Sequence, residues 1–304
     1  MTKVATALLT SAILLTSSQA AAYLCTRVVD ANGEESGPSI SWLSRQITFA
    51  LHKDGTATVD GTEEFDEIRA AFQVWEDISL GWNGTGCPSP VEDTDLTFTE
   101  ASALSSLNRV GYDYLNPANN ENLMVFRDDA WPHPNMTGMI IGLTTTTYNS
   151  LTGEIFDADI EFNAAQFPFT IGDHNVQTDL MNTTVHEIGH FLGLGHTLDA
   201  EATMYGSAAT GEVKKRDIGC DDAQAIALKY PAGQPNGYCP GTPAAPCGFC
   251  QQPESLTNTV EIKITDSSAG GESSGGCQQL EGISALAGIA LLLMLARRRK
   301  GQRC

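Results

Sequence analysis

The stretch HEIGHFLGLGH, which runs from His186 to His196, holds three of the six histidines of this 304-residue chain. His186 and His190 are four residues apart, so on a helix their imidazoles lie on one face, one turn apart. Either Asp179 or Asn182 can cap such a helix, and the apolar residues between 180 and 188 give it a buried side. The spacing therefore predicts a helix that carries two imidazoles toward one point.

Gly193 is expected to end this helix in a left-handed conformation and to turn the chain sharply. His196 then returns as a third ligand beside His186 and His190. Three neutral imidazoles leave one tetrahedral position open, which is the arrangement of a catalytic zinc site. Glu187 adjoins the first histidine and can take a proton from a zinc-activated water and pass it to a leaving amine. We therefore predict one catalytic Zn²⁺ with Glu187 as the general base of peptide hydrolysis.

The extended pattern H-E-x-x-H-x-x-G-x-x-H is followed by Met204 in HTLDAEATMY, which is typical of a Met-turn. On these residues the chain resembles a metzincin zinc protease and, within that clan, a matrixin. Four other segments between about 39 and 231 resemble the first helix, two strands and the last helix of matrixins: IRAAFQVWEDIS (68–79), DLTFTE (95–100), GEIFDADIEFN (153–163) and CDDAQAIALKYP (220–231). The resemblance implies an α+β metzincin/matrixin catalytic domain, a twisted mixed β-sheet with long helices and a Met-turn.

The same resemblance implies a secreted or cell-surface zinc endopeptidase that acts as a monomer on protein or peptide substrates. An edge strand at 139–145 would pair with the extended substrate, and the loop 205–216 would form the S1′ wall. The region before DADIEF lacks the histidines of a second matrixin zinc, and no Cys-switch propeptide is recognisable. The alternative is a non-catalytic, surface-attached metzincin-fold binding protein. The presence of Glu187 with all three ligands favours the enzyme.

Asp157, Asp159 and Glu161 alternate along a predicted strand and therefore share one face. Three carboxylates on one face can bind calcium through oxygen ligands, as matrixins do near this strand. A solvated acidic face is the other interpretation, and the sequence does not choose between them. The three histidines outside the motif are interpreted as structural or solvated side chains.

The net charge of −20 argues against nucleic-acid binding, because no basic stripe is available to neutralise phosphates. Residues 1–22 read as a signal peptide, with cleavage favoured after Ala22, and residues 23–231 as the catalytic domain. Export to an oxidising compartment suits eight cysteines. We expect Cys25 to pair with Cys87 and Cys220 with Cys239, although the sequence leaves connectivity open.

Beyond 231 the composition changes to a Cys/Pro/Gly/Ser-rich linker over 232–276, in which TVEIKIT is an isolated strand candidate. Residues 277–304 comprise Cys277, an apolar run and RRRK. The order resembles MYXO-CTERM sorting tails, which implies membrane attachment through the tail and processing near Cys277 by a sorting protease. We therefore expect the protein at the cell surface or envelope, or released outside the cell.

Overall fold

The computed structural model describes residues 23–29, 35–80, 87, 91–134, 140–237 and 239, together with the backbone of 257–261. The predicted signal peptide (1–22), most of the predicted linker (232–276) and the sorting tail (277–304) lie outside these ranges. No helix in the described part of the chain is both long enough and apolar enough to cross a membrane.

A mixed sheet forms the centre of the molecule, with strand order β12-β7-β8-β6-β4-β5. All neighbouring strands are parallel except β7 and β8, which are antiparallel. The alternating apolar residues of QITFAL place β4 with Ile47 and Phe49 buried, as its period predicts. The strands are β4 (Gln46–Leu51), β5 (Thr97–Glu100), β6 (Leu123–Phe126), β7 (Gly142–Tyr148), β8 (Ile155–Phe162) and β12 (Thr257–Glu261).

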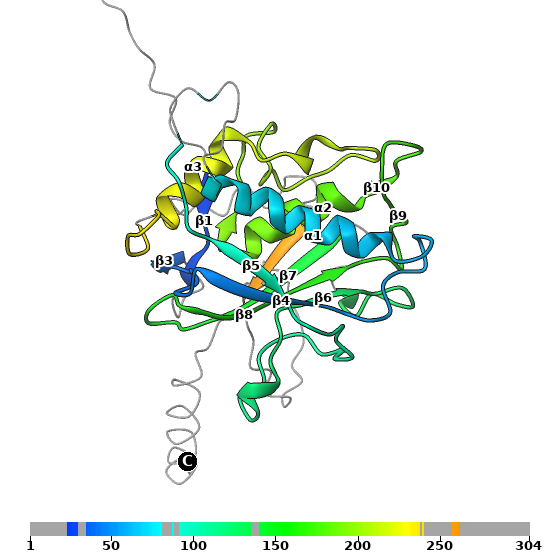
Figure 1. Ribbon diagram of the computed structural model, residues 1–304, viewed down its shortest axis with the longest axis horizontal. Helices are drawn as coiled ribbons and strands as arrows, with labels where there is room; N and C mark the ends of the chain where they lie inside the picture. The colour runs from blue at the N-terminus through cyan, green and yellow to red at the C-terminus, as the bar shows by residue number, and fades with distance from the viewer. Residues whose placement is uncertain are drawn as a thin grey trace, which may run out of the picture.

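Two helices, α1 (Glu63–Glu76) and α2 (Leu180–Phe191), lie together on one face of this sheet (Figure 1). Acidic residues in the first turn of α1 favour helix initiation there, five residues earlier than the motif at 68–79 indicates. Phe72 of α1 stacks on Phe49 of β4 at a centroid distance of 3.9 Å and meets Phe191 of α2 edge-on at 5.7 Å. The Trp75 indole donates to the Val185 carbonyl at 2.9 Å, which fixes α1 against α2.

Helix α3 (Cys220–Lys229) lies near the first described residues of the chain (Figure 1). Short strands pair with one another outside the main sheet, and 3₁₀ turns connect larger elements. These are β1 (Leu24–Cys25) with β11 (Leu194–Gly195), β2 (Arg27–Val29) with β3 (Glu35–Ser39), β9 (Phe169–Thr170) with β10 (Thr178–Asp179), η1 (Asp77–Leu80), η2 (Pro117–Asn119) and η4 (Lys214–Arg216).

The segment after α3 packs on the body beyond the predicted boundary at 231. Ala232 N donates to the Asp93 carbonyl at 3.0 Å, and the Asn236 amide donates to Ser41 Oγ and to the Trp42 carbonyl, both at 2.9 Å. Further along, β12 includes the first three residues of TVEIKIT and has a partner that the sequence did not indicate. It lies parallel to β7, with Thr257 opposite Gly142.

The four expected disulfide cysteines do pair, but the expected connectivity is wrong. Cys25 pairs with Cys239, and Cys87 with Cys220, at Cα–Cα distances of 6.0 and 5.4 Å. The tertiary fold explains why the disulfide partners differ from those expected. The chain turns back along α3, where Gly237 N donates to the Lys229 carbonyl at 3.0 Å, and so brings Cys239 to β1.

Candidate metal centre and catalytic carboxylate

Helix α2 begins after Asp179, one of the two N-cap residues predicted from the sequence. Asp179 Oδ1 accepts a hydrogen bond from Asn182 N at 2.7 Å, so Asp179 is the cap and Asn182 lies within the helix. Every residue from Thr183 to Phe191 is buried. The helix therefore carries His186, Glu187 and His190 into the interior between the sheet and the segment that follows α2.

The three predicted imidazoles meet at one point. His186 Nε2 lies 3.2 Å from His196 Nε2, and His190 Nε2 lies 3.0 Å from the same atom. Nitrogens that bind one tetrahedral zinc at about 2.0–2.1 Å lie roughly 3.3 Å apart. Within the described part of the chain, these three histidines are the group of metal-binding residues with ligand atoms close enough to share an ion. Their donor set and spacing fit zinc.

Two of the imidazoles are oriented by backbone carbonyls. His186 Nδ1 lies 2.6 Å from the Thr203 carbonyl and His190 Nδ1 lies 2.8 Å from the Leu194 carbonyl. A proton on each Nδ1 leaves the lone pair of Nε2 for a metal. Burial lowers the pKa of His190 to about 4 and those of His186 and His196 well below the usual value, so all three rings stay neutral in the absence of metal.

Gly193 behaves as its position in the motif predicts. Its φ is +82°, and Gly193 N donates to the His190 carbonyl at 2.8 Å as the helix ends. A Cβ here would come within 2.5 Å of the Ile40 carbonyl oxygen. Glycine is therefore required both for the left-handed turn and for the close approach that returns His196 to the site.

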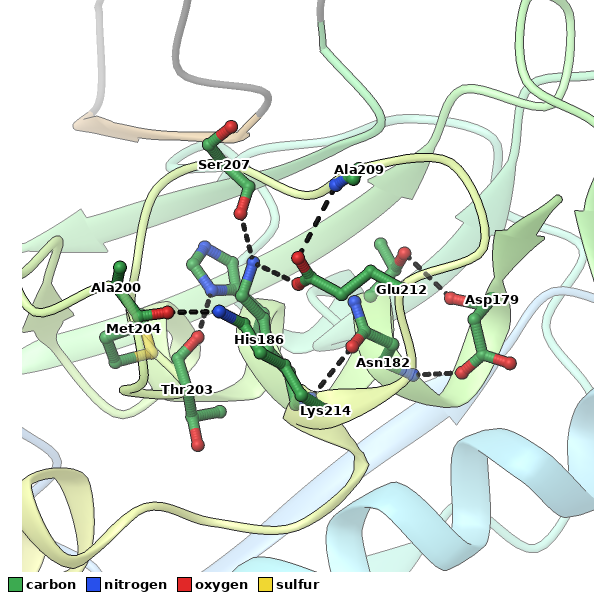
Figure 2. A network of polar contacts seen from close by, with 12 residues as sticks. Asp179, Asn182, His186, Ala200, Thr203, Met204, Ser207, Ala209, Glu212 and Lys214 are labelled. Atoms are coloured by element: carbon green, nitrogen blue, oxygen red, sulfur yellow. Dashed lines mark hydrogen bonds and ion pairs between the residues drawn. The ribbon is translucent and has the colours of Figure 1, made fainter. Parts of the chain in front are cut away.

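The turn around Met204 lies directly beneath α2. The Met204 sulfur is so close to Gly189 that a Cβ on this glycine would come within 2.1 Å of it. Thr203, the preceding residue, is the one that orients His186 (Figure 2). Asp222 of α3 accepts from Thr203 N at 2.6 Å and from Met204 N at 3.2 Å. The Met-turn is thus held by α3 and in turn supports a predicted ligand.

Glu187 is fully buried beside the three imidazoles. Its Oε2 accepts from Thr144 Oγ1 at 2.6 Å, whereas its Oε1 has no hydrogen-bond partner among the described residues. Burial raises the pKa of this carboxyl to about 8, against the opposing effects of the Thr144 hydrogen bond and the Lys215 charge. One oxygen is therefore fixed and the other is available to a water or a substrate.

The carboxylates considered for calcium share a face of β8 but have partners in the protein. Glu161 pairs with Arg127 at 2.6 Å and with His133 at 2.7 Å. Asp159 accepts from two backbone N–H groups at 2.6 and 2.8 Å. Burial and the neighbouring Asp159 raise the pKa of Asp157. All three are buried, so they do not form a solvated acidic face, and the calcium assignment stays a prediction.

Two residues at the site, Thr144 and Lys215, were not identified from the sequence. Thr144 lies 43 positions from Glu187 on a strand of threonines, and no local pattern marks it. Lys215 is only 3% exposed, and its ammonium donates to the Ser207 carbonyl at 2.7 Å. A basic residue in KKR reads as a surface charge in the sequence. Its burial depends on the loop folding over α2.

The Matrixin family model matches residues 136–231, which contain α2, the three histidines and the Met-turn. Matrix metalloproteinase-16 of Homo sapiens is 27% identical over 210 residues, covering 67% of this chain and 29% of that protein. Metalloendoproteinase 2-MMP of Arabidopsis thaliana is 47% identical over 54 residues, 18% of this chain and 14% of the relative. Metalloendoproteinase 1 of Glycine max is 40% identical over 75 residues, 25% of this chain and 24% of the relative.

The chain thus spans less than a third of the length of these curated relatives. The matched segment and the mixed sheet with its helices agree with the predicted fold class. The described body has the α+β fold of a matrixin-type metzincin catalytic domain.

Proposed function

We propose that this protein is a zinc-dependent endopeptidase. The observation that carries the proposal is the meeting of three neutral imidazoles beside a buried carboxylate with one oxygen free of hydrogen bonds. A structural zinc site needs no such carboxylate, because its four ligands close the coordination shell. The similarity to the matrix metalloproteinases and the plant metalloendoproteinases supports the same activity.

His186, His190 and His196 would hold the metal through Nε2. When bound, zinc supplies the Lewis acidity that activates a water and polarises a peptide carbonyl. Glu187 Oε1 accepts the proton of the attacking water, and the same carboxyl then delivers it to the leaving nitrogen. Thr144 keeps Oε2 in place throughout, so the proton is exchanged at one defined oxygen. No group of the protein forms a covalent bond to the substrate.

An extended substrate would approach along β7. Gly142 at the start of this strand faces Glu187 so closely that a Cβ would come within 2.7 Å of Oε1. Backbone hydrogen bonds from the strand edge to a peptide give affinity without demanding one sequence. In the full chain β12 pairs with this edge, so a substrate that adds to β7 must displace it.

For the whole chain we propose export and a tether at the cell envelope. The support is sequence order alone, namely a signal peptide at 1–22, a linker at 232–276 and a sorting tail at 277–304 with Cys277 as the processing point. The substrates would then be proteins or peptides outside the cell.

Replacement of Glu187 by alanine separates metal binding from turnover. Glu187→Ala should retain one zinc per chain by elemental analysis, because all three ligands remain, and should lose ~10²–10⁴-fold in peptide cleavage. Glu121→Ala is the matched control, since this carboxylate is exposed in a loop. Full activity in Glu187→Ala would refute the general-base role. A zinc-loaded wild-type chain that cleaves nothing would favour the non-catalytic binding protein.

A further inference from the structure

A cavity of about 230 Å³ opens beside the first turn of α2, the helix that carries Glu187. Its walls are formed by Ile141, the residue before Gly142, by Asn182 and Thr183 of α2, and by the loop 205–216 through Ala208 and Glu212. Asn182 lies four residues before His186, so it is on the same face of α2 and roughly 6 Å below the ligand along the helix axis. A side chain adjacent to the scissile bond can therefore reach it.

The two acidic groups of the cavity wall are each neutralised by a basic partner. Asp179 pairs with Arg216 through two contacts, at 2.9 and 2.5 Å. Glu212 pairs with the buried Lys215 ammonium at 3.1 Å. A charged substrate side chain entering this space would lose its hydration without finding an unpaired opposite charge, which is costly. The wall therefore disfavours both acidic and basic side chains.

Two polar side chains of the wall, Asn182 and Glu212, have defined donor and acceptor roles. Asn182 Oδ1 accepts from Lys215 N at 2.8 Å, which directs the amide nitrogen of Asn182 away from that contact. Figure 2 shows this side chain and Glu212 reaching into the space between α2 and the loop. Glu212 Oε1 lies 3.1 Å from the Lys215 ammonium, and Glu212 Oε2 accepts only a long hydrogen bond, from Ala209 N at 3.4 Å. The cavity thus offers a donor from Asn182 and an acceptor from Glu212.

We propose that this cavity selects a neutral side chain that both accepts and donates hydrogen bonds and is as long as glutamine, and that Asn182 and Glu212 determine this specificity. The inference rests on the proposed peptidase function. A glutamine amide presents its oxygen to the Asn182 nitrogen and its N–H to the Glu212 carboxylate. Leucine fills similar space but offers neither an acceptor to the Asn182 nitrogen nor a donor to the Glu212 carboxylate. Unpaired polar groups in a buried site are a strong source of discrimination.

The test uses the zinc-loaded full chain and a degenerate peptide mixture whose cut sites are mapped by mass spectrometry. Matched peptides carrying Gln, Leu, Glu or Lys at the selected position next to the cut then give kcat/KM ratios. One neutral hydrogen bond and one to the Glu212 carboxylate correspond to a Gln:Leu ratio of roughly tenfold or more. Glu212→Gln removes the charge that neutralises Lys215 and should shift the Glu:Gln ratio toward Glu by about tenfold or more.

Glu201→Gln is the matched control, because Glu201 lies 3.9 Å from Lys214 in an exposed pair and does not line the cavity. A structural defect would lower all rates together without moving the ratios. Preference for Leu, Glu or Lys in the wild type, or an unchanged ratio in Glu212→Gln, would overturn the assignment while leaving the peptidase intact. Absence of all cleavage by the zinc-loaded chain would overturn the proposed function and this inference with it.

Discussion

Lys229 of α3 is a fully buried lysine whose titration should be visible in the stability of the protein. Its Nζ contacts the Ile40 carbonyl and lies 3.3 Å from the Gly193 carbonyl, at the turn that ends α2. Burial lowers its pKa from the usual 10.5 to about 7. A neutral amine has two N–H groups, which suffice for these two carbonyls. The perturbation is Lys229→Met, which keeps the length and removes the titration.

Because the pKa of Lys229 is lower in the folded state, the stability of the protein should rise with pH. Between pH 7 and 10.5 the unfolded chain binds this proton more fully than the folded chain, so the folded state gains stability as the pH rises. At pH 7 the folded lysine is about half protonated and the unfolded one almost fully. At pH 9 the folded lysine is neutral and the unfolded one is still protonated. Integration over this interval gives a gain of about 2 kcal/mol for the wild type.

Urea unfolding of both proteins at pH 7, 8 and 9, with disulfides intact, measures this gain. All other titrating groups are shared by the two proteins. Between pH 7 and 9 the free energy of unfolding of the wild type should therefore rise by about 2 kcal/mol relative to that of Lys229→Met. Lys53→Met is the control for the same substitution at a half-exposed lysine. If the difference for Lys229→Met does not change with pH, Lys229 does not titrate in this range and the prediction is refuted.

Three further predictions concern the tail and its attachments. Thr259→Pro should raise kcat/KM on a quenched peptide, because proline is excluded from the interior of a paired strand and a substrate would no longer have to displace β12; an unchanged value would show that β12 does not compete. Cys239→Ser should lower the free energy of unfolding by ~2–5 kcal/mol, measured in urea, and an equal loss on reduction of the wild type would assign it to the disulfide. Deletion of 280–304 should move the protein from the envelope fraction to the medium with activity unchanged, and retention in the envelope would refute the sorting role of the tail.

The zinc ligands could be predicted from the sequence because their arrangement is set locally. The four-residue spacing of His186 and His190 fixes one helix face, and Gly193 permits the turn that returns His196. The first helix, two of the strands and the last helix were indicated by the resemblance, and alternating apolar residues support the strands. These signals lie within about ten residues of each other, so helix and strand periodicity is enough to interpret them.

Other parts of the site depend on contacts that no local pattern contains. Thr144 meets Glu187 only because β7 packs against α2 in the tertiary fold. Lys215 is buried only because the loop 205–216 folds over the first turn of α2. The disulfides were mispaired for the same reason, since partner choice depends on how α3 packs against β1 and not on spacing along the chain.

A chain of contacts from α3 to the metal site explains why this helix belongs to the catalytic domain although it carries no ligand. Asp222 in its first turn holds the backbone of Thr203, and the Thr203 carbonyl orients His186. Cys220, the first residue of α3, is bonded to Cys87, which ties the helix start to the segment after α1. A shift of α3 would therefore move the carbonyl that sets the tautomer of one ligand, and metal affinity is sensitive to such supporting contacts by about 10–100-fold. The geometry at His186 is thus set by residues more than thirty positions away as firmly as by the motif itself.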